Sequence, residues 1–142
     1  MPATDATDRV PFSYVILRVV PSVERGERIN VGVVLHCRQR RFLGVRWCVD
    51  AGRLAALGPR IDHLTPAAAG AEIEGHLRAL ARVAAGDPGA GAVAALDRSD
   101  RFGWLAAPSS TIVQPSSVHA GLCEDPAATL DALFERLVGV GS

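Results

Sequence analysis

The chain has 142 residues, and its 15 basic and 15 acidic side chains give a formal net charge of zero. Hydrophobic residues make up 49% and charged residues 21%, which excludes a disordered tail or a strongly charged nucleic-acid arm and is typical of one globular domain. All the basic residues are arginine; because this indicates a GC-rich genome, each arginine by itself is weak evidence for function.

The charge distribution and the cysteine content indicate which cellular compartment and which kinds of partner suit this chain. Residues 1–60 carry ten arginines and five acids, and residues 61–142 carry the reverse. We expect the charges of the two halves to meet within one domain, the alternative being a basic face for a partner. There is no signal-peptide pattern, no apolar run of about 20 residues and no paired cysteine motif, so we expect a cytoplasmic protein without a membrane segment.

We expect a disordered tail over residues 1–9, followed by a single domain over 10–140. Three strands are predicted in the first part of this domain. Residues 12–20 are apolar on both faces except at Arg18, which predicts a central strand that is covered on both sides. Residues 29–37 and 41–49 alternate in hydrophobicity and predict two further strands that form a hairpin.

The hydrophobic pattern also predicts how this hairpin is paired. If Cys37 pairs with Arg41 across a three-residue loop, the most apolar faces of the two strands coincide. In that register Asn30, His36 and Arg46 share the less apolar face, and Arg18 joins them if the first strand pairs in the matching sense.

The remainder reads as helical apart from one strand. Asp50 caps a short turn over 51–57, Thr65-Pro66 begins a helix that ends at Ala85, and Ser99 caps a helix over 100–107. Residues 110–114 predict a fourth strand, and Asp125-Pro126 begins the last helix. Two helices have buried stripes, predicted at Ile73, Leu77, Leu80 and Ala84 and at Leu130, Leu133, Phe134 and Leu137. The predicted class is α+β: a mainly antiparallel sheet of about four strands with helices packed on it.

Motifs for chemistry are scarce. The four histidines are scattered, and the sequence has no CxxC, HExxH, phosphate-binding loop or GxSxG, so we expect no metal and no cofactor. Arg38, Arg40 and Arg41 lie at the predicted hairpin tip and could contact phosphates. With aromatic residues at 5%, we favour a role for these arginines in blocking strand-to-strand aggregation.

Two polar clusters hold the candidate binding residues, one in the turn that opens the second strand and one around the fourth strand. If those strands are neighbours, Asn30, Arg46, Gln114 and His119 could line one pocket; the alternative is a structural hydrogen-bond network. The full set of candidates is Glu24, Arg25, Glu27, Asn30, Arg46, Arg101, Trp104, Ser110, Gln114 and His119.

These clusters carry a family resemblance. The string from Tyr14 through Glu24-Arg25-Gly26-Glu27 to Asn30-Val-Gly-Val-Val-Leu35 resembles the opening of the family called domain of unknown function 3037. The segments 101–123 and 125–137 resemble its second block and its closing helix, so the resemblance spans roughly residues 12 to 138. The family has no assigned activity. The resemblance implies a small bacterial protein that accompanies a HipA-like serine/threonine kinase.

Our first hypothesis is therefore a non-catalytic protein-interaction or regulatory module, with a HipA-like kinase or a second copy of the chain as partner. A first alternative is a small-ligand-binding protein or hydrolase-like enzyme that uses a polar pocket at the sheet; its residues would be Glu24, Glu27, Asn30, Arg101, Gln114 and His119. A second alternative is nucleic-acid binding through the arginine-rich hairpin.

Overall fold

The computed structural model describes residues 8–22, 27–56, 66–108 and 112–139. Within them the strands are β1 (Val10–Ser22), β2 (Glu27–Cys37), β3 (Phe42–Trp47), β4 (Val113–Pro115) and β5 (His119–Cys123). The helices are α2 (Ala51–Ala56), α3 (Pro66–Ala85), α4 (Arg98–Ala106) and α5 (Pro126–Leu137), with short 3₁₀ turns η1 (Pro88–Ala90) and η2 (Ala92–Ala95). The predicted α+β class is confirmed.

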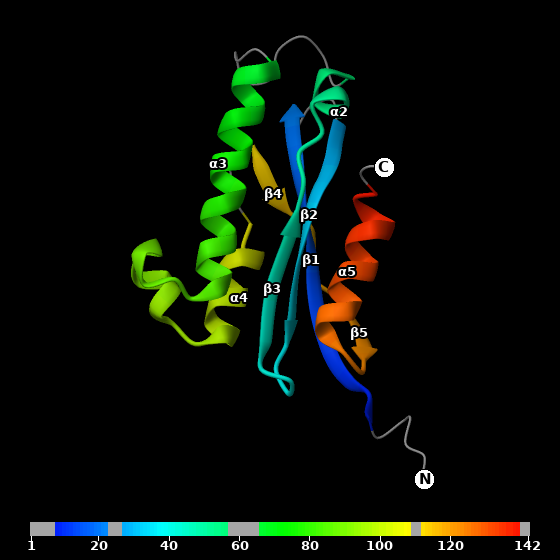
Figure 1. Ribbon diagram of the computed structural model, residues 1–142, viewed down its shortest axis with the longest axis vertical. Helices are drawn as coiled ribbons and strands as arrows, with labels where there is room; N and C mark the ends of the chain where they lie inside the picture. Colours follow the sequence, from blue (N-terminus) through cyan, green and yellow to red (C-terminus); the bar gives the residue numbers. More distant parts are fainter. Residues whose placement is uncertain (1–7, 23–26, 57–65, 109–111, 140–142) are drawn as a thin grey trace.

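The sheet is antiparallel and is organised about β1 (Figure 1). One side of β1 pairs with β2, which in turn pairs with β3. The other side pairs with β5 at the start of β1 and with β4 further along it. β5 was not predicted, because its sequence HAGLC contains glycine and alanine and no β-branched residue.

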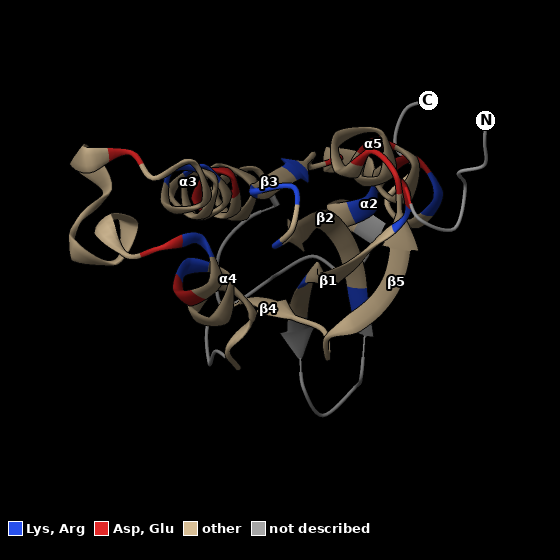
Figure 2. Cartoon of the chain, turned by 90° about the horizontal axis from the view of Figure 1, so that it is seen from below, with Lys and Arg blue, Asp and Glu red and all other residues tan. Residues whose placement is uncertain are grey.

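Helices cover both faces of the sheet. α3 and α4 lie on one face, and α5 lies on the other (Figures 1 and 2). Val15, Leu17 and Val19 of β1 point to the α3/α4 face and are almost completely buried. Val33, Leu35 and Cys37 of β2 form a second core with α5. The central strands therefore need apolar residues on both faces, as the pattern of β1 predicted.

Capping residues set where the helices begin. Asp125 starts α5 by accepting hydrogen bonds from the backbone N–H groups of residues 127 and 128. The cap of α4 is Asp97, whose carboxylate accepts from the N–H of Asp100 at 2.9 Å. The prediction of Ser99 as this cap was wrong by two positions, because an aspartate that precedes the helix can reach the same free N–H groups.

The predicted hairpin register was wrong by one residue. Cys37 pairs with Phe42, and the connection is a four-residue turn, 38–41, in which Arg41 adopts a positive φ of 53°. The register was argued from a single apolar face. Here both faces of β2 and β3 are covered, so Phe42 also finds an apolar environment, against α5. Its neighbour Leu43 packs in the core on the other side.

Because of a β-bulge, the residues that share the polar face differ from those predicted. The pairing of β1 with β2 shifts between Leu17, opposite Gly32, and Arg18, opposite Asn30, so that Val31 is an extra residue. The extra residue reverses the alternation and turns Asn30 toward α5. His36, which was expected beside Asn30, lies on the opposite face, where its ring stacks on Phe102 with the centroids 5.2 Å apart.

The close approach of strands at Gly32 gives a stability prediction. A Cβ at Gly32 would lie 2.9 Å from the carbonyl oxygen of Arg46 and 3.1 Å from the Cβ of Trp47. Because neither backbone can yield cheaply, Gly32→Ala should lower the free energy of unfolding by about 1–3 kcal/mol in chemical denaturation. Gly75→Ala is the matched control: nothing lies within 4 Å of that position in α3, and the change should stabilise by up to about 1 kcal/mol. Equal effects of the two substitutions would contradict this account of the close approach at Gly32.

Candidate functional site

A row of three polar residues crosses the sheet on the α5 face. Arg18 of β1 lies between Asn30 of β2 and Gln114 of β4, its partners in the two ladders. Asn30 donates through Nδ2 to the carbonyl oxygen of Leu137 at 3.0 Å. Burial, and to a lesser degree the neighbouring Arg28, lowers the pKa of Arg18. This row brings together two of the predicted candidates, and Arg18 with them.

Arg53 holds the end of α5 together with Asn30. Arg53 donates through Nη1 to the carbonyl oxygen of Val138 at 2.7 Å. The last carbonyl groups of a helix have no partners within it and carry partial negative charge, so an amide and a guanidinium are suitable partners. Asn30 and Arg53 therefore have a structural function at the C-terminal end of α5.

Arg46 and His119 lie on the same face but not beside this row. Arg46, on β3, forms an ion pair with Asp131 at 2.9 Å, and its guanidinium lies 4.3 Å from the centre of the Phe134 ring. Three inter-strand spacings, about 14 Å, separate β3 from β4. His119 stacks on Tyr14 with ring centroids 5.1 Å apart, four residues of β1 away from the Arg18 row. The four residues share a face and lie at separate points along it.

Arg101 and Trp104 lie on the other side of the sheet, in α4. Arg101 donates to the carbonyl oxygens of Leu96 and Ala84. Its Nε is buried and has no hydrogen-bond partner among the described residues. The guanidinium thus ties α4 to the end of α3. The indole of Trp104, by contrast, is 48% exposed.

Trp104 borders an apolar recess between α3, α4 and β4. Its volume is about 280 Å³. Apart from His76 of α3 and the indole N–H, the side chains around it are apolar. The lining residues are Leu17, His76, Leu80, Trp104, Leu105, Ala107, Pro108, Val113 and Pro115. Nothing in the sequence pattern indicated the recess, because its walls come from four separate segments.

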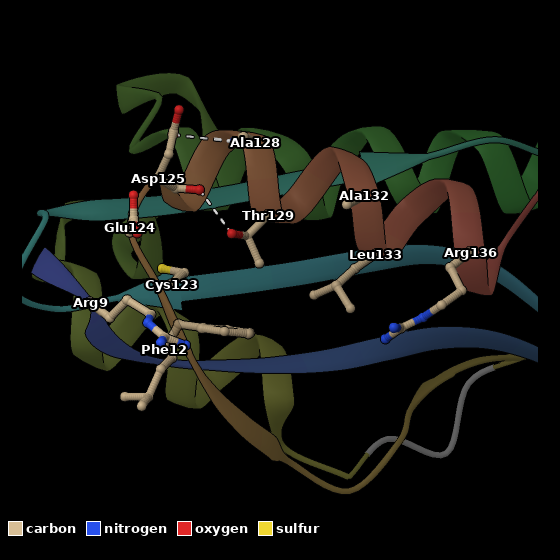
Figure 3. A pocket seen from close by; sticks show the side chains of 11 residues that line it. Arg9, Phe12, Cys123, Glu124, Asp125, Ala128, Thr129, Ala132, Leu133 and Arg136 are labelled. Carbon is tan, nitrogen blue, oxygen red and sulfur yellow. Dashed lines mark hydrogen bonds between the residues drawn. The ribbon is translucent and has the colours of Figure 1, made fainter. Parts of the chain in front are cut away.

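A wider groove runs between α5 and the edge formed by β5 and the start of β1 (Figure 3). Its volume is about 570 Å³, and Phe12 and Leu133 line its apolar part. Glu124, Asp125 and Arg9 lie at the end where α5 begins, and Arg136 lies toward the other end (Figure 3). We refer to this feature below as the α5 groove.

The hairpin arginines occupy the 38–41 turn. Arg38, Arg40 and Arg41 are exposed, and Arg40 donates to the backbone carbonyl of Asp8. Three other candidates, Glu24, Arg25 and Ser110, lie outside the described residues, as do residues 1–7 of the tail that was predicted over residues 1–9. Glu27 is the first residue of β2.

Two thiols lie in the core beneath the α5 groove. Cys37 donates to the carbonyl oxygen of Pro11 at 3.4 Å. Burial raises the pKa of the Cys123 thiol, and the neighbouring Cys37 raises it further. A raised pKa keeps a thiol protonated and unreactive, so Cys123 acts as a small core residue.

Comparisons with known proteins identify one family. The model of a family described as "Protein of unknown function (DUF3037)" matches residues 14–138, most of the chain. No curated protein and no solved structure matches significantly. Within the described ranges, no three histidine, cysteine or acidic side chains gather to hold a metal ion. None of the helices described has the length and apolar character that crossing a membrane requires.

The burial of His36 gives a pH prediction. Burial is the largest cause that lowers its pKa below 6.5; Arg38 and Arg98 also lower it, and Asp97 opposes them. As the pH falls below about 6.5, the unfolded chain takes up a proton that the folded chain resists, so folding stability should decrease until the pH passes the lowered pKa. His36→Phe should show a shallower decrease than the unmodified chain in denaturation curves at pH 5 to 8. A decrease of unchanged slope would assign the effect to another group.

Proposed function

The chain belongs to the DUF3037 family, and from that premise we propose that it is a non-catalytic module that binds a partner protein. The recess beside Trp104 carries the proposal. A half-exposed tryptophan next to an apolar hollow is a typical anchor point of a protein interface, because tryptophan contributes large contact area at a small cost in entropy.

The size of the recess favours an anchoring side chain over a separate small molecule. Pockets for small ligands commonly have about 300–1,000 Å³, whereas this recess has about 280 Å³. Its walls offer many apolar atoms and only two polar groups, His76 and the Trp104 indole. One apolar or aromatic side chain of a partner would pack against these apolar walls and lose most of its contact with water.

The distribution of the polar candidates supports a non-catalytic module. Arg101 lies on the α3/α4 side of the sheet, and Asn30 and His119 lie on the α5 face. Groups that transfer a proton in one reaction must lie within about 3 Å of the atoms they serve. The sheet itself separates these residues, so they do not act on one substrate atom.

For the partner we propose a HipA-like kinase in the bacterial cytoplasm. The support is the family resemblance, which implies that such a kinase accompanies the protein, together with a binding surface that is apolar. The zero net charge of the chain gives no long-range steering toward a strongly charged partner such as a nucleic acid.

The proposal predicts a strong effect of one side chain. Trp104→Ala should raise the Kd for a purified HipA-like kinase by about tenfold or more in titration calorimetry, because hot-spot tryptophans contribute about 2 kcal/mol or more. Leu96→Ala is the matched control, since Leu96 is similarly exposed at 43% and does not line the recess; its Kd should change by less than about twofold. No binding of the unmodified chain at micromolar concentration, or equal Kd values for Trp104→Ala and the unmodified chain, would refute the proposal.

A further inference from the structure

β5 lies at an edge of the sheet and leaves backbone groups facing outward. Ile16 of β1 exchanges hydrogen bonds with Ser116, so its N–H and C=O point to the β4/β5 side. Backbone direction alternates along a strand, so Tyr14, Phe12 and Val10 point the same way. Their partners on β5 are the residues 119, 121 and 123. The N–H and C=O groups of Ala120 and Leu122 must therefore point away from β1.

This edge lacks the usual protection. Exposed edges are commonly blocked by charged side chains, proline or a covering element, and β5 contains no charged residue and no proline. Its Leu122 is 60% exposed, and Val118 just before the strand is 54% exposed. The opposite edge, β3, is flanked by helices on both faces and by the arginine-rich turn. Outward backbone groups beside exposed apolar side chains are the features of an edge that another strand can join.

We propose that β5 pairs with β5 of a second copy of this chain, antiparallel about a two-fold axis at Gly121. Ala120 then lies opposite Leu122 of the second copy, and the reverse, so that all four outward backbone groups of each strand segment find partners. Leu122 packs beside the small Ala120 of the second copy on one face. Because the axis is perpendicular to the sheet, α5 of both copies lies on the other face, and the two α5 grooves open toward each other.

The charges of the α5 groove identify a second copy as the occupant. Glu124, Asp125 and Arg9 lie at the end of the groove where α5 begins, and Arg136 lies toward its other end. Asp125 is occupied as the helix cap. Among the described residues, neither Glu124 nor Arg136 has an ion-pair partner. With Arg9 beside the two carboxylates, the first end keeps one net negative charge, and the other end carries the positive charge of Arg136. Such a groove is complementary to itself when turned end to end, as a two-fold axis requires.

The lengths of the two elements agree with this pairing. Arg136 is eleven residues along the chain from Asp125, which is about 16 Å along a helix axis. In the proposed register, Glu124 of the second copy lies opposite Val118 of the first. Val118 is five strand residues from Cys123 of its own copy, a distance of about 17 Å along the edge. α5 lies over β2 and β3 and runs in the same direction as β1, because Asn30, opposite Arg18, contacts its last turn. Arg136 therefore reaches the level of Glu124 of the second copy, and the contact occurs twice per dimer.

The backbone part is tested by light scattering on the full chain after gel filtration. The unmodified chain should elute with about twice the 14.9 kDa mass of one copy. Leu122→Pro should give one copy, because it removes an outward N–H and no N–H that pairs with β1. Leu122→Ala is the matched control, since it removes the apolar side chain but keeps that N–H; its dimer should be weaker but detectable at high concentration.

The charge part is tested by exchanging charges. Glu124→Arg and Arg136→Glu should each give one copy, because each places like charges at both contacts of the dimer. A mixture of these two variants should restore the dimer, because every contact then joins an arginine to a glutamate. Circular dichroism of each variant before mixing shows whether it is folded, and recovery on mixing cannot come from an unfolded chain.

Three results would overturn the proposal. The first is a monomeric mass for the unmodified chain at concentrations up to about 100 µM. The second is a Leu122→Pro variant that is still dimeric, and the third is a mixture of the folded charge variants that stays monomeric. None of these results bears on the Trp104 recess, whose lining includes no residue of β5. The kinase titration therefore tests the proposed function, and the mass measurement tests the dimer, so either proposal can fail without the other.

Discussion

The pairing of β1 on both of its sides is the constraint on which the other elements depend. Its backbone joins β2 on one side and β4 and β5 on the other, so segments that are about 100 residues apart in the chain become neighbours. A strand in this position has no free backbone edge along its paired length. The helices that cover its α3/α4 face explain why Val15, Leu17 and Val19 are almost fully buried. The two helical layers follow from the same requirement, because each apolar face of the central strands must be covered.

The bulge at Val31 decides which residues share the α5 face. One extra residue in β2 turns Asn30 toward α5, where its amide holds the last turn of that helix. On the same face, the ion pair between Arg46 and Asp131 joins the basic first part of the chain to the acidic second part. At this ion pair, a basic residue of the first part is therefore neutralised by an acidic residue of the second part within the fold. That reduces the evidence for a basic docking face.

The two proposed contact surfaces lie on different sides of the molecule. The recess beside Trp104 opens on the side of α3 and α4, and the α5 groove lies on the side of α5. A dimer formed through β5 would carry two such recesses, related by the two-fold axis. A partner that is itself dimeric could then bind at both, and its apparent affinity would rise through the effective concentration of the second site.

The amino-acid sequence by itself determined the α+β class, the central position of the first strand and the buried stripe of α3, because these depend on periodicities that each segment carries alone. It also marked most helix boundaries through Asp50, Pro66 and Asp125. The position of β5, the hairpin register and the turning of Asn30 away from His36 were decided only by tertiary structure. β5 has little strand propensity of its own and exists because β1 offers it hydrogen-bond partners. The register depended on α5 covering the second face of β2, a contact about 100 residues away that no local pattern encodes.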